Sequence, residues 1–532
     1  MKKRIMALSF ALVLALTGCG KEESAASSGG AFNKETVTTN RQSGSDISLY
    51  MRPPSTLNPL ENDDETVDMV LRLVYEPLIG IDNDFKPYGN LAEGWYFSNE
   101  GKTITIKLKK GLRWHSGSAI TADDVAYSIN TIKNAKESSI YKSCVKYIED
   151  VTMIDSLTVN IDFKRAFYGN IYALTFPLIS HRAGSGQNVY EGASSMTKLG
   201  NGSFDFGSYT VSKSLELVKD KSCIGKDAVA ERINVVISKD KDNDLYYFTT
   251  GVTDCIYGKA TDFVGKTLPA RAAEYSFSTG EYDFIGFNFN NPVLNNKSVR
   301  KAVAYCVPKD EMLKVIYLSN ATLTDSPINP SSWLYEKDVV KYDYNINEAK
   351  RVLEENGWIG DVSTTAMYKD TEEGRLTLSL SILVNKENEQ RRQVAKRMAD
   401  ELMAAGFSIE VKELSFEEYA EAISNGNYDM VIGGWSLSYD NDLKVLFGNY
   451  GNNIIRYNDE TMNGYLEAIN EAVGEGNVKS AYSDIQKYIS EELPYISLTF
   501  KKGKLYTGDN IEGGNDVIGG WVFGGVYNWI KR

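Results

Sequence analysis

The segment from Leu376 to Asp442 constrains the fold most, because two different periodicities alternate along it. Polar and apolar residues alternate from Leu376 to Ile382, and apolar residues continue to Val384, which predicts a strand that becomes fully buried. Apolar residues from Val394 to Ala405 then recur at helical spacing, and Gly406 is placed to end that helix.

A second strand, a second helix and a third strand follow. Ile409 begins the second strand, Ser415 and Glu418 form a capping box that opens the helix, and the run from Tyr428 to Trp435 is mostly apolar. Strands that alternate with helices at this spacing pair in parallel through right-handed crossovers. Short antiparallel-looking strands between Tyr209 and Val218 indicate that the sheets as a whole are mixed. The sequence therefore predicts an α/β fold.

Two loops follow strands of this predicted sheet, and both carry polar side chains. Open parallel sheets bind ligands beyond the carboxyl ends of their strands. The first loop runs from Asn385 to Glu389, and the second from Ser436 to Asp442, beside the flat ring of Trp435. The rim of the sheet is therefore the predicted binding site.

The first residues have the pattern of an export signal. Three basic residues at positions 2–4 precede an apolar run from Ile5 to Leu16, which is shorter than the about 20 residues needed to span a bilayer. The residues Leu-Thr-Gly-Cys, ending at Cys19, match the bacterial lipobox. We expect residues 1–18 to be a signal peptide, Cys19 to carry lipid, and residues 19–44 to form a flexible tether. This predicts an extracytoplasmic protein anchored to the cell membrane.

Length and charge limit the remaining possibilities. A chain of 532 residues is long enough for two or three domains. The formal net charge is -13, and loss of the basic signal residues makes it more negative. A surface this acidic repels a phosphate backbone, so we expect no nucleic-acid partner.

The sequence offers little for catalysis or for metal binding. It contains no GxSxG or HExxH motif and only two histidines. A loose phosphate-loop pattern ending at Lys266 lacks a following helix, and the acidic run from Asp240 to Asp244 is predicted to be a solvated turn rather than a calcium loop. We therefore predict no catalytic residue, no metal and no cofactor. The cysteines beyond Cys19 allow two disulfides or four free thiols, and they are Cys144, Cys223, Cys255 and Cys306.

Many short blocks of the chain resemble the family 5 extracellular solute-binding proteins, which include the oligopeptide-, dipeptide- and nickel-binding receptors of ABC importers. The blocks begin with Leu57–Leu60, Val74–Leu78 and Leu91–Trp95, and they are densest from Gly101 to Ser128. Later blocks include Ile285–Asn290 and Glu492–Tyr495. Within the blocks, Trp95 and Trp114 are interpreted as core aromatics and His115 as a hydrogen-bonded structural residue.

The resemblance implies a two-lobed periplasmic-binding-protein-like fold of type II, in its large peptide-receptor subtype with an extra subdomain. Two chain crossings join the lobes, near Gly286 to Asn290 and near Tyr495 to Phe500, with Gly286, Asn288 and Asn290 as hinge residues. The first lobe would comprise residues 45–285 and 497–532, with an inserted subdomain at about 75–190. The second lobe would comprise residues 286–496.

The resemblance also bears on the ligand. In peptide-binding members an Asp in the loop after the Gly-Trp strand pairs with the ligand's α-ammonium group, because a buried ammonium needs a nearby carboxylate. Ser438 stands at that position here, so Asp440 or Asp442 would have to serve in a shifted register. Further candidates are Trp435, Tyr439, Asn441 and Asn385.

These observations predict a monomeric, non-catalytic receptor that closes by hinge motion on a short peptide and delivers it to an ABC permease. A small saccharide or a metal chelate is the alternative ligand. A ligand sensor and a surface hydrolase are the alternative classes of function.

Overall fold

The computed structural model describes residues 46–183, 199–221, 227–360, 366–448, 453–517 and 520–532. The predicted signal peptide, Cys19 and the tether lie outside the described residues. Among the residues described, no helix combines the length and the apolar character needed to cross a bilayer.

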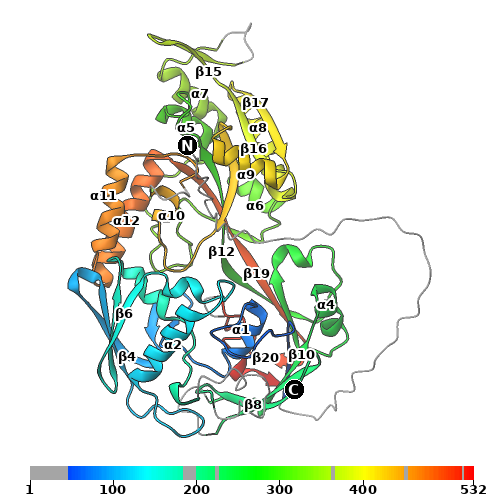
Figure 1. Cartoon of the computed structure of the whole chain (residues 1–532). Helices are drawn as coiled ribbons and strands as arrows, with labels where there is room; N and C mark the ends of the chain where they lie inside the picture. Colours follow the sequence, from blue (N-terminus) through cyan, green and yellow to red (C-terminus); the bar gives the residue numbers. More distant parts are fainter. Residues whose placement is uncertain (1–45, 184–198, 222–226, 361–365, 449–452, 518–519) are drawn as a thin grey trace, which may run out of the picture.

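The first lobe contains two four-stranded sheets (Figure 1). Their strands are β1 (Asp46–Met51), β8 (Phe204–Thr210), β9 (Ser214–Lys219) and β10 (Arg232–Ile237) in one sheet, and β4 (Ala92–Ser98), β5 (Thr103–Leu108), β6 (Ile148–Asp155) and β7 (Thr158–Phe163) in the other. The first sheet has the order β1-β10-β9-β8, with only β1 and β10 parallel. The second is antiparallel in the order β4-β5-β7-β6 and belongs to the inserted subdomain.

The predicted local structure of the subdomain is largely confirmed. Helix α2 (Ala122–Asn134) begins after Thr121, whose backbone N–H donates to Asp124 Oδ2 at 2.8 Å. Trp114 is buried as expected, whereas Trp95 is only half-buried because it lies on an edge strand. A short hairpin, β2 (Ile79–Ile81) and β3 (Pro87–Gly89), precedes β4.

The second lobe is built on one large mixed sheet, one end of which extends into the first lobe. Its strands are β11 (Cys255–Lys259), β12 (Ala273–Phe287), β13 (Ala321–Leu323), β16 (Ser379–Asn385), β17 (Ser408–Leu414), β18 (Met430–Ser436) and β19 (Tyr495–Thr507), in the order β11-β19-β12-β18-β16-β17 with β13 paired to β19. The helices of this lobe are α5 (Lys297–Tyr305), α6 (Lys309–Val315), α7 (Ile346–Glu355), α8 (Glu389–Ala404) and α9 (Phe416–Asn425).

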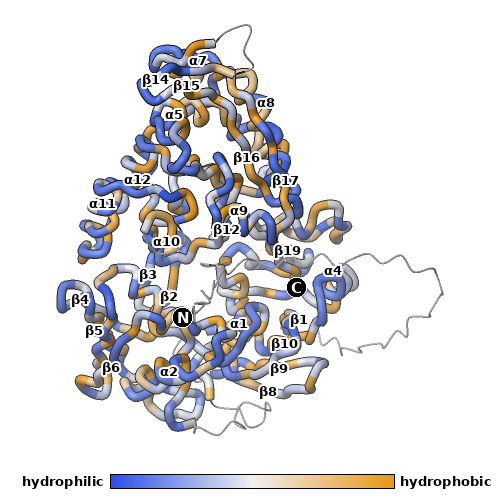
Figure 2. Tube along the Cα trace, turned by 45° about the horizontal axis from the view of Figure 1, so that its top comes forward, coloured by the Kyte–Doolittle hydropathy of each residue, from blue (hydrophilic) through white to orange (hydrophobic). Residues whose placement is uncertain are grey.

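The strand and helix alternation predicted from the sequence is confirmed. Strand β16 pairs in parallel with both β17 and β18, α8 is followed by Gly406 at φ +100°, and the Ser415–Glu418 capping box is formed. Nearly all of β16 is buried, whereas most residues of β17, at the edge of the sheet, are partly exposed. Figure 2 shows the hydropathy of the residues along both strands. One detail was wrong: the first strand does not run continuously from Leu376, because β14 (Tyr368–Thr371) and β15 (Gly374–Thr377) form a separate hairpin.

The chain passes between the lobes along two long neighbouring strands, β12 and β19. The end of β19 pairs with β11 in the first lobe, and its beginning pairs with the part of β12 that borders β18. The register of the β12–β19 pair shifts between Ser278 and Tyr282, on the first-lobe side of the predicted domain boundary. The two crossings in Figure 1 therefore run as a paired ribbon.

The three predicted hinge residues lie at the second-lobe end of this ribbon. Gly286 pairs with Val431 and Tyr495 inside the sheet. The Asn288 side-chain amide donates to the Tyr428 carbonyl at 2.7 Å, and its Oδ1 accepts from the Asn290 N–H at 3.1 Å. Their role as hinges stays a prediction, as do the domain bounds.

Apolar residues form two main cores. One fills the second lobe between its sheet and helices α5, α7 and α8. The larger core begins in the first lobe and extends into α10 (Lys444–Phe447), α11 (Glu460–Glu471) and α12 (Glu475–Glu492). Helix α12 ends before Pro494, as the sequence predicted. The segment after β18 is thus packed against the first lobe.

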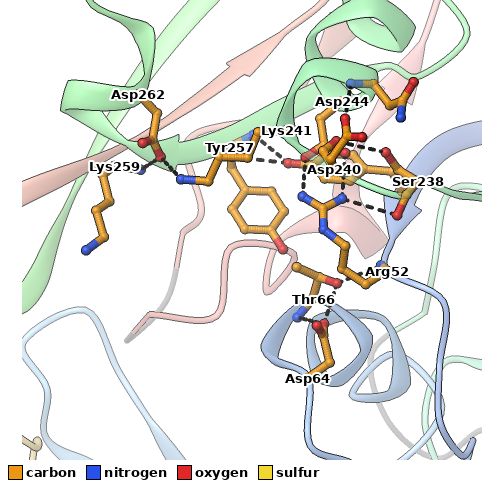
Figure 3. Close-up of polar contacts among 12 residues, drawn as sticks. Arg52, Asp64, Thr66, Ser238, Asp240, Lys241, Asp244, Tyr257, Lys259 and Asp262 are labelled. Atoms are coloured by element: carbon orange, nitrogen blue, oxygen red, sulfur yellow. Dashed lines mark hydrogen bonds and ion pairs between the residues drawn. The ribbon is translucent and has the colours of Figure 1, made fainter. Parts of the chain in front are cut away.

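A polar network fixes helix α1 (Glu65–Leu71) in the first lobe (Figure 3). Arg52 makes a two-pronged ion pair with Asp244, at 2.8 and 2.6 Å, and its backbone N–H donates to Thr66 Oγ1 at the start of α1. The acidic run after Ser238 begins a helix rather than forming the turn predicted; Asp240 and Asp242 are exposed as expected, but Asp244 is not. Asp240 caps helix α4 (Lys241–Thr249). Asp244 is buried, and its ion pair with Arg52 compensates the cost of burying its charge.

The described cysteines are free thiols: Cys144, Cys255 and Cys306. Cys223 lies outside the described residues. Pairing of all four cysteines in two disulfides is therefore ruled out.

Candidate functional site

The loop after β18 was the principal site predicted from the sequence. The Leu437 N–H donates to the Gly280 carbonyl at 2.9 Å, which attaches the start of the loop to the crossing ribbon. The Ser438 hydroxyl donates to Asp440 Oδ1, and the same oxygen accepts from the Asp442 N–H at 3.2 Å. The Asn441 amide donates to the Tyr439 carbonyl at 2.7 Å. These bonds give the loop a defined conformation.

The loop contacts the first lobe through Tyr439 and Asp442, and it contacts helix α12 through Asn441. Asp442 forms an ion pair with Arg165 at 2.7 Å, and the rings of Tyr439 and Phe85 lie 4.8 Å apart between centroids. The Asn441 carbonyl accepts from the Tyr482 hydroxyl at 2.8 Å. Asp442 is therefore occupied by a protein cation.

Asp440 is also held within the protein. Burial raises the pKa of its carboxyl group, the hydrogen bond from Ser438 opposes this, and the neighbouring charge of Asp442 adds to the increase. Its backbone carbonyl lies against Gly169 of the subdomain, where an added Cβ would come within 2.8 Å. The roles predicted for Asp440 and Asp442 in binding a ligand ammonium stay predictions, and neither residue lines the two cavities described next.

Two cavities lie on either side of Tyr439. The smaller, of about 10 Å³, is lined by Ser438 and Asn441 of the loop and by Gly280 and Phe500 of the crossing strands. The larger, of about 170 Å³, is lined by first-lobe residues and by Tyr439 from the second lobe. Tyr439 is thus the common wall, and burial raises its pKa to about 12, so the phenol is neutral at ordinary pH.

The larger cavity contains charged groups from α1 and the residues after it. Asp68 accepts a hydrogen bond from the Tyr141 hydroxyl at 2.7 Å, and Glu76 accepts one from the Asn90 amide at 2.7 Å. The guanidinium of Arg72 lies 5.2 Å from the ring centre of Trp521. Burial alone would lower the pKa of Arg72. The nearby Tyr141 and the carboxylates of Asp68 and Glu76 have the larger, opposite effect, so the pKa of Arg72 is raised.

Two other predicted residues lie elsewhere on the sheet rim. Asn385 ends β16, and its Oδ1 accepts from the Glu387 N–H at 2.7 Å, which turns the chain toward α8. Trp435 pairs with Tyr282 across the β12–β18 ladder, and its Nε1 is buried without a hydrogen-bond partner. Neither residue lines either of the two cavities.

A buried ion cluster supports this rim. Asp283 on β12 lies between Arg391 of α8, at 2.7 Å, and Lys501 of β19, at 3.3 Å. Burial alone would raise the pKa of Asp283, but the two cations lower it below the usual value. The cluster ties both crossing strands to the helix that follows β16.

One group of residues in the first lobe has metal-binding chemistry. His115, Asp205 and Asp220 are buried, and one ligand atom of each lies within 4.8 Å of the others. Zinc accepts such ligands, but His115 Nε2 already bonds to the Gly202 carbonyl at 2.8 Å, as expected of a structural histidine. None of the three lines either cavity.

Comparison with known proteins assigns the family. The model of the bacterial extracellular solute-binding proteins, family 5, matches residues 86–456. The chain belongs to this family. The solute-binding protein is a substrate-binding protein of an ABC importer, and the family consists of receptors rather than enzymes.

Relatives of this solute-binding protein cover nearly its whole length. The oligopeptide-binding protein AppA of Bacillus subtilis is 25% identical over 96% of each chain. Heme-binding protein A of Haemophilus influenzae is 24% identical over 93% of each chain.

Solved structures confirm the predicted two-lobed fold. The ABC transporter substrate binding protein CtaP from Listeria monocytogenes has a TM-score of 0.70 at 20% identity and covers 92% of this chain and 99% of its own. HbpA2 from Haemophilus parasuis has a TM-score of 0.74 at 18% identity, with 92% and 99% covered.

The sequence prediction missed the charged wall of the larger cavity. Asp68, Arg72 and Glu76 recur every four residues in an otherwise apolar stretch. Residues four apart share one face of a helix, and charge on an apolar face is unusual. The four-residue spacing of these charges is the sequence signal from which the charged wall could have been predicted.

Proposed function

We propose that this solute-binding protein captures a short peptide between its two lobes and delivers it to the permease of an ABC importer, without chemical turnover. The observation that carries the proposal is the interlobe cavity closed by Tyr439 of the second lobe against first-lobe residues. A site shared between two bodies joined by a paired ribbon can close by hinge motion. Peptide-binding relatives, among them the AppA of Bacillus subtilis, support a peptide as the guest.

Peptide capture can be tested on the purified protein. After incubation with a mixed peptide digest, native mass spectrometry should detect bound peptides, and calorimetry on one of them gives the affinity. Tyr439→Ala should weaken that affinity about tenfold or more, since it removes an aromatic wall and about 1.4 kcal/mol corresponds to tenfold.

The matched control is Tyr96→Ala, because Tyr96 is 62% exposed and lines neither cavity. Thermal melting of the empty variants separates lost binding from lost folding. A wild-type protein that retains a glycan or a metal chelate and no peptide would refute the peptide assignment.

Membrane attachment through Cys19 is a separate part of the proposal. The lipobox sequence before Cys19 supports it. Cys19→Ala should abolish incorporation of a labelled fatty acid in the host and leave the protein unattached or unprocessed. Labelling of the variant at the wild-type level would contradict the anchor.

A further inference from the structure

His115 presents a ring nitrogen that makes no hydrogen bond within the described part of the chain. The residue is 7% exposed, and its Nε2 lies 2.8 Å from the carbonyl oxygen of Gly202. A carbonyl oxygen only accepts, so Nε2 carries the proton and donates it. The other ring nitrogen, Nδ1, is buried and has no hydrogen-bond partner among the described residues. A bound ion or water accounts for a buried polar atom in this state.

Two buried carboxylates lie beside this nitrogen. Asp205 of β8 and Asp220, directly after β9, are 2% and 7% exposed. His115 Nδ1 is 3.4 Å from Asp205 Oδ1, which is longer than the about 2.7–2.9 Å of a charge-assisted hydrogen bond. The same oxygen accepts from the Phe206 N–H at 2.9 Å and keeps a second lone pair. Both carboxylates also have other partners, so the imidazole nitrogen is the group that identifies the site.

The spacing of these atoms matches the edge of a metal coordination shell. Imidazole nitrogens and carboxylate oxygens bind zinc at about 2.0–2.2 Å, so two ligands of a tetrahedral ion lie about 3.4 Å apart. The Nδ1–Oδ1 distance of 3.4 Å equals this separation. One ligand atom of each of the three residues lies within 4.8 Å of the others, and rotation of a carboxylate group closes the wider pairs.

The imidazole ring is held in position by the segment before β8. The His115 backbone N–H donates to the Gly200 carbonyl at 2.8 Å, and the ring bonds to Gly202. A Cβ at Gly200 would lie 2.8 Å from His115 Cε1, so a glycine is needed for this close approach. Metal-binding histidines commonly donate their second ring nitrogen to a carbonyl, which orients the free nitrogen toward the ion. The bond to Gly202 therefore prepares Nδ1 as a ligand and does not compete with that role.

We propose that His115 Nδ1, Asp205 and Asp220 bind a divalent transition-metal ion, with zinc as the ion to be tested. One histidine is sufficient because carboxylates supply the other protein ligands, and water or a second carboxylate oxygen completes the shell. His115 lies in a turn after β5 of the inserted subdomain, whereas the two carboxylates belong to the β1-β10-β9-β8 sheet and its end. The ion thus joins the subdomain to the main sheet of the first lobe. None of its ligands lines either cavity, so it is a structural ion and not the guest.

Zinc binding by the purified, untagged protein tests the site. After bound metal is removed with a chelator, calorimetry in the absence of peptide should show one zinc ion per chain. His115→Gln and Asp220→Asn each remove a ligand with little change of volume, and each should weaken zinc binding about tenfold or more. Zinc should also raise the melting temperature of the wild type more than that of either variant, because only the folded chain brings the ligands together.

The matched control is His181→Gln. His181 is the second of the two histidines of the chain, and its Nδ1 lies 2.7 Å from Asp124 Oδ1, away from the proposed ligands. This variant should bind zinc as the wild type does. Circular dichroism of each metal-free variant separates lost binding from lost folding. X-ray absorption of zinc bound to the wild type needs no variant, and it should show one imidazole among oxygen ligands.

Three results would overturn the site. They are a wild type that binds no zinc, equal zinc affinity of the wild type and a folded His115→Gln, and bound zinc without an imidazole ligand. The outcome is independent of the peptide proposal because no guest is present. A protein that binds peptide but not zinc refutes only the metal site, and one that binds zinc but no peptide refutes only the proposed function.

Discussion

Asp283→Asn is expected to destabilise the protein by about 3–5 kcal/mol, the usual cost of removing one partner of a buried ion pair. The variant leaves Arg391 and Lys501 without their counter-charge next to a carboxylate position that is 1% exposed. Because the cluster joins β12, β19 and α8, the loss should loosen the rim of the second-lobe sheet. Urea denaturation followed by circular dichroism measures the change.

The control for this substitution is Asp370→Asn. Asp370 pairs with Arg375, but both side chains are more than half exposed, and such pairs contribute little. The midpoint of unfolding should therefore stay at the wild-type value. Equal effects of the two substitutions would contradict the role assigned to Asp283.

The same cluster predicts a dependence of stability on pH. The pKa of folded Asp283 lies below its unfolded value of about 3.9, so the stabilisation is complete above that pH. It is lost as the pH falls through the unfolded value toward the folded one. Asp283→Asn should remove this part of the acid sensitivity, and identical slopes for both proteins below pH ~4 would contradict it.

Gly280→Ala is expected to have the second large effect, on binding as well as on stability. A Cβ at Gly280 would lie 2.2 Å from the backbone carbonyl oxygen of Leu437, a contact that no side-chain rotation can relieve. We expect a loss of about 1–3 kcal/mol in stability, as for other overpacked sites. Displacement of Leu437 would also move Tyr439, so guest affinity should fall about tenfold or more.

A second glycine separates steric effects from the effect of adding a methyl group. Gly464 lies within α11, and an added Cβ there meets nothing within 4 Å. Gly464→Ala should be neutral or stabilising by up to about 1 kcal/mol, because Ala favours helix. Calorimetry and thermal melting of both variants provide the comparison. Unchanged guest affinity in Gly280→Ala would show that the loop does not depend on this contact.

Local patterns in the sequence were sufficient wherever the physical cause is itself local. The capping box of Ser415 and Glu418 depends on groups three residues apart, and the parallel pairing of β16 follows from the alternation of short strands with helices. The interpretation of the run from Asp240 to Asp244 as a solvated turn failed at Asp244, because this carboxylate is buried and pairs with Arg52, which is far away in the chain. Nothing in the neighbouring residues indicates that partner.

Sequence alone thus determined the α/β class, the family and the position of the loop after β18. Tertiary structure decided what that loop does: Asp442 faces Arg165, whereas Tyr439 closes a cavity that contains Arg72. The physical reason is that the energy of a charge depends on what surrounds it after folding. Arg72, Tyr439 and Trp521 are distant in sequence, and only the packing of the two lobes brings them to one cavity.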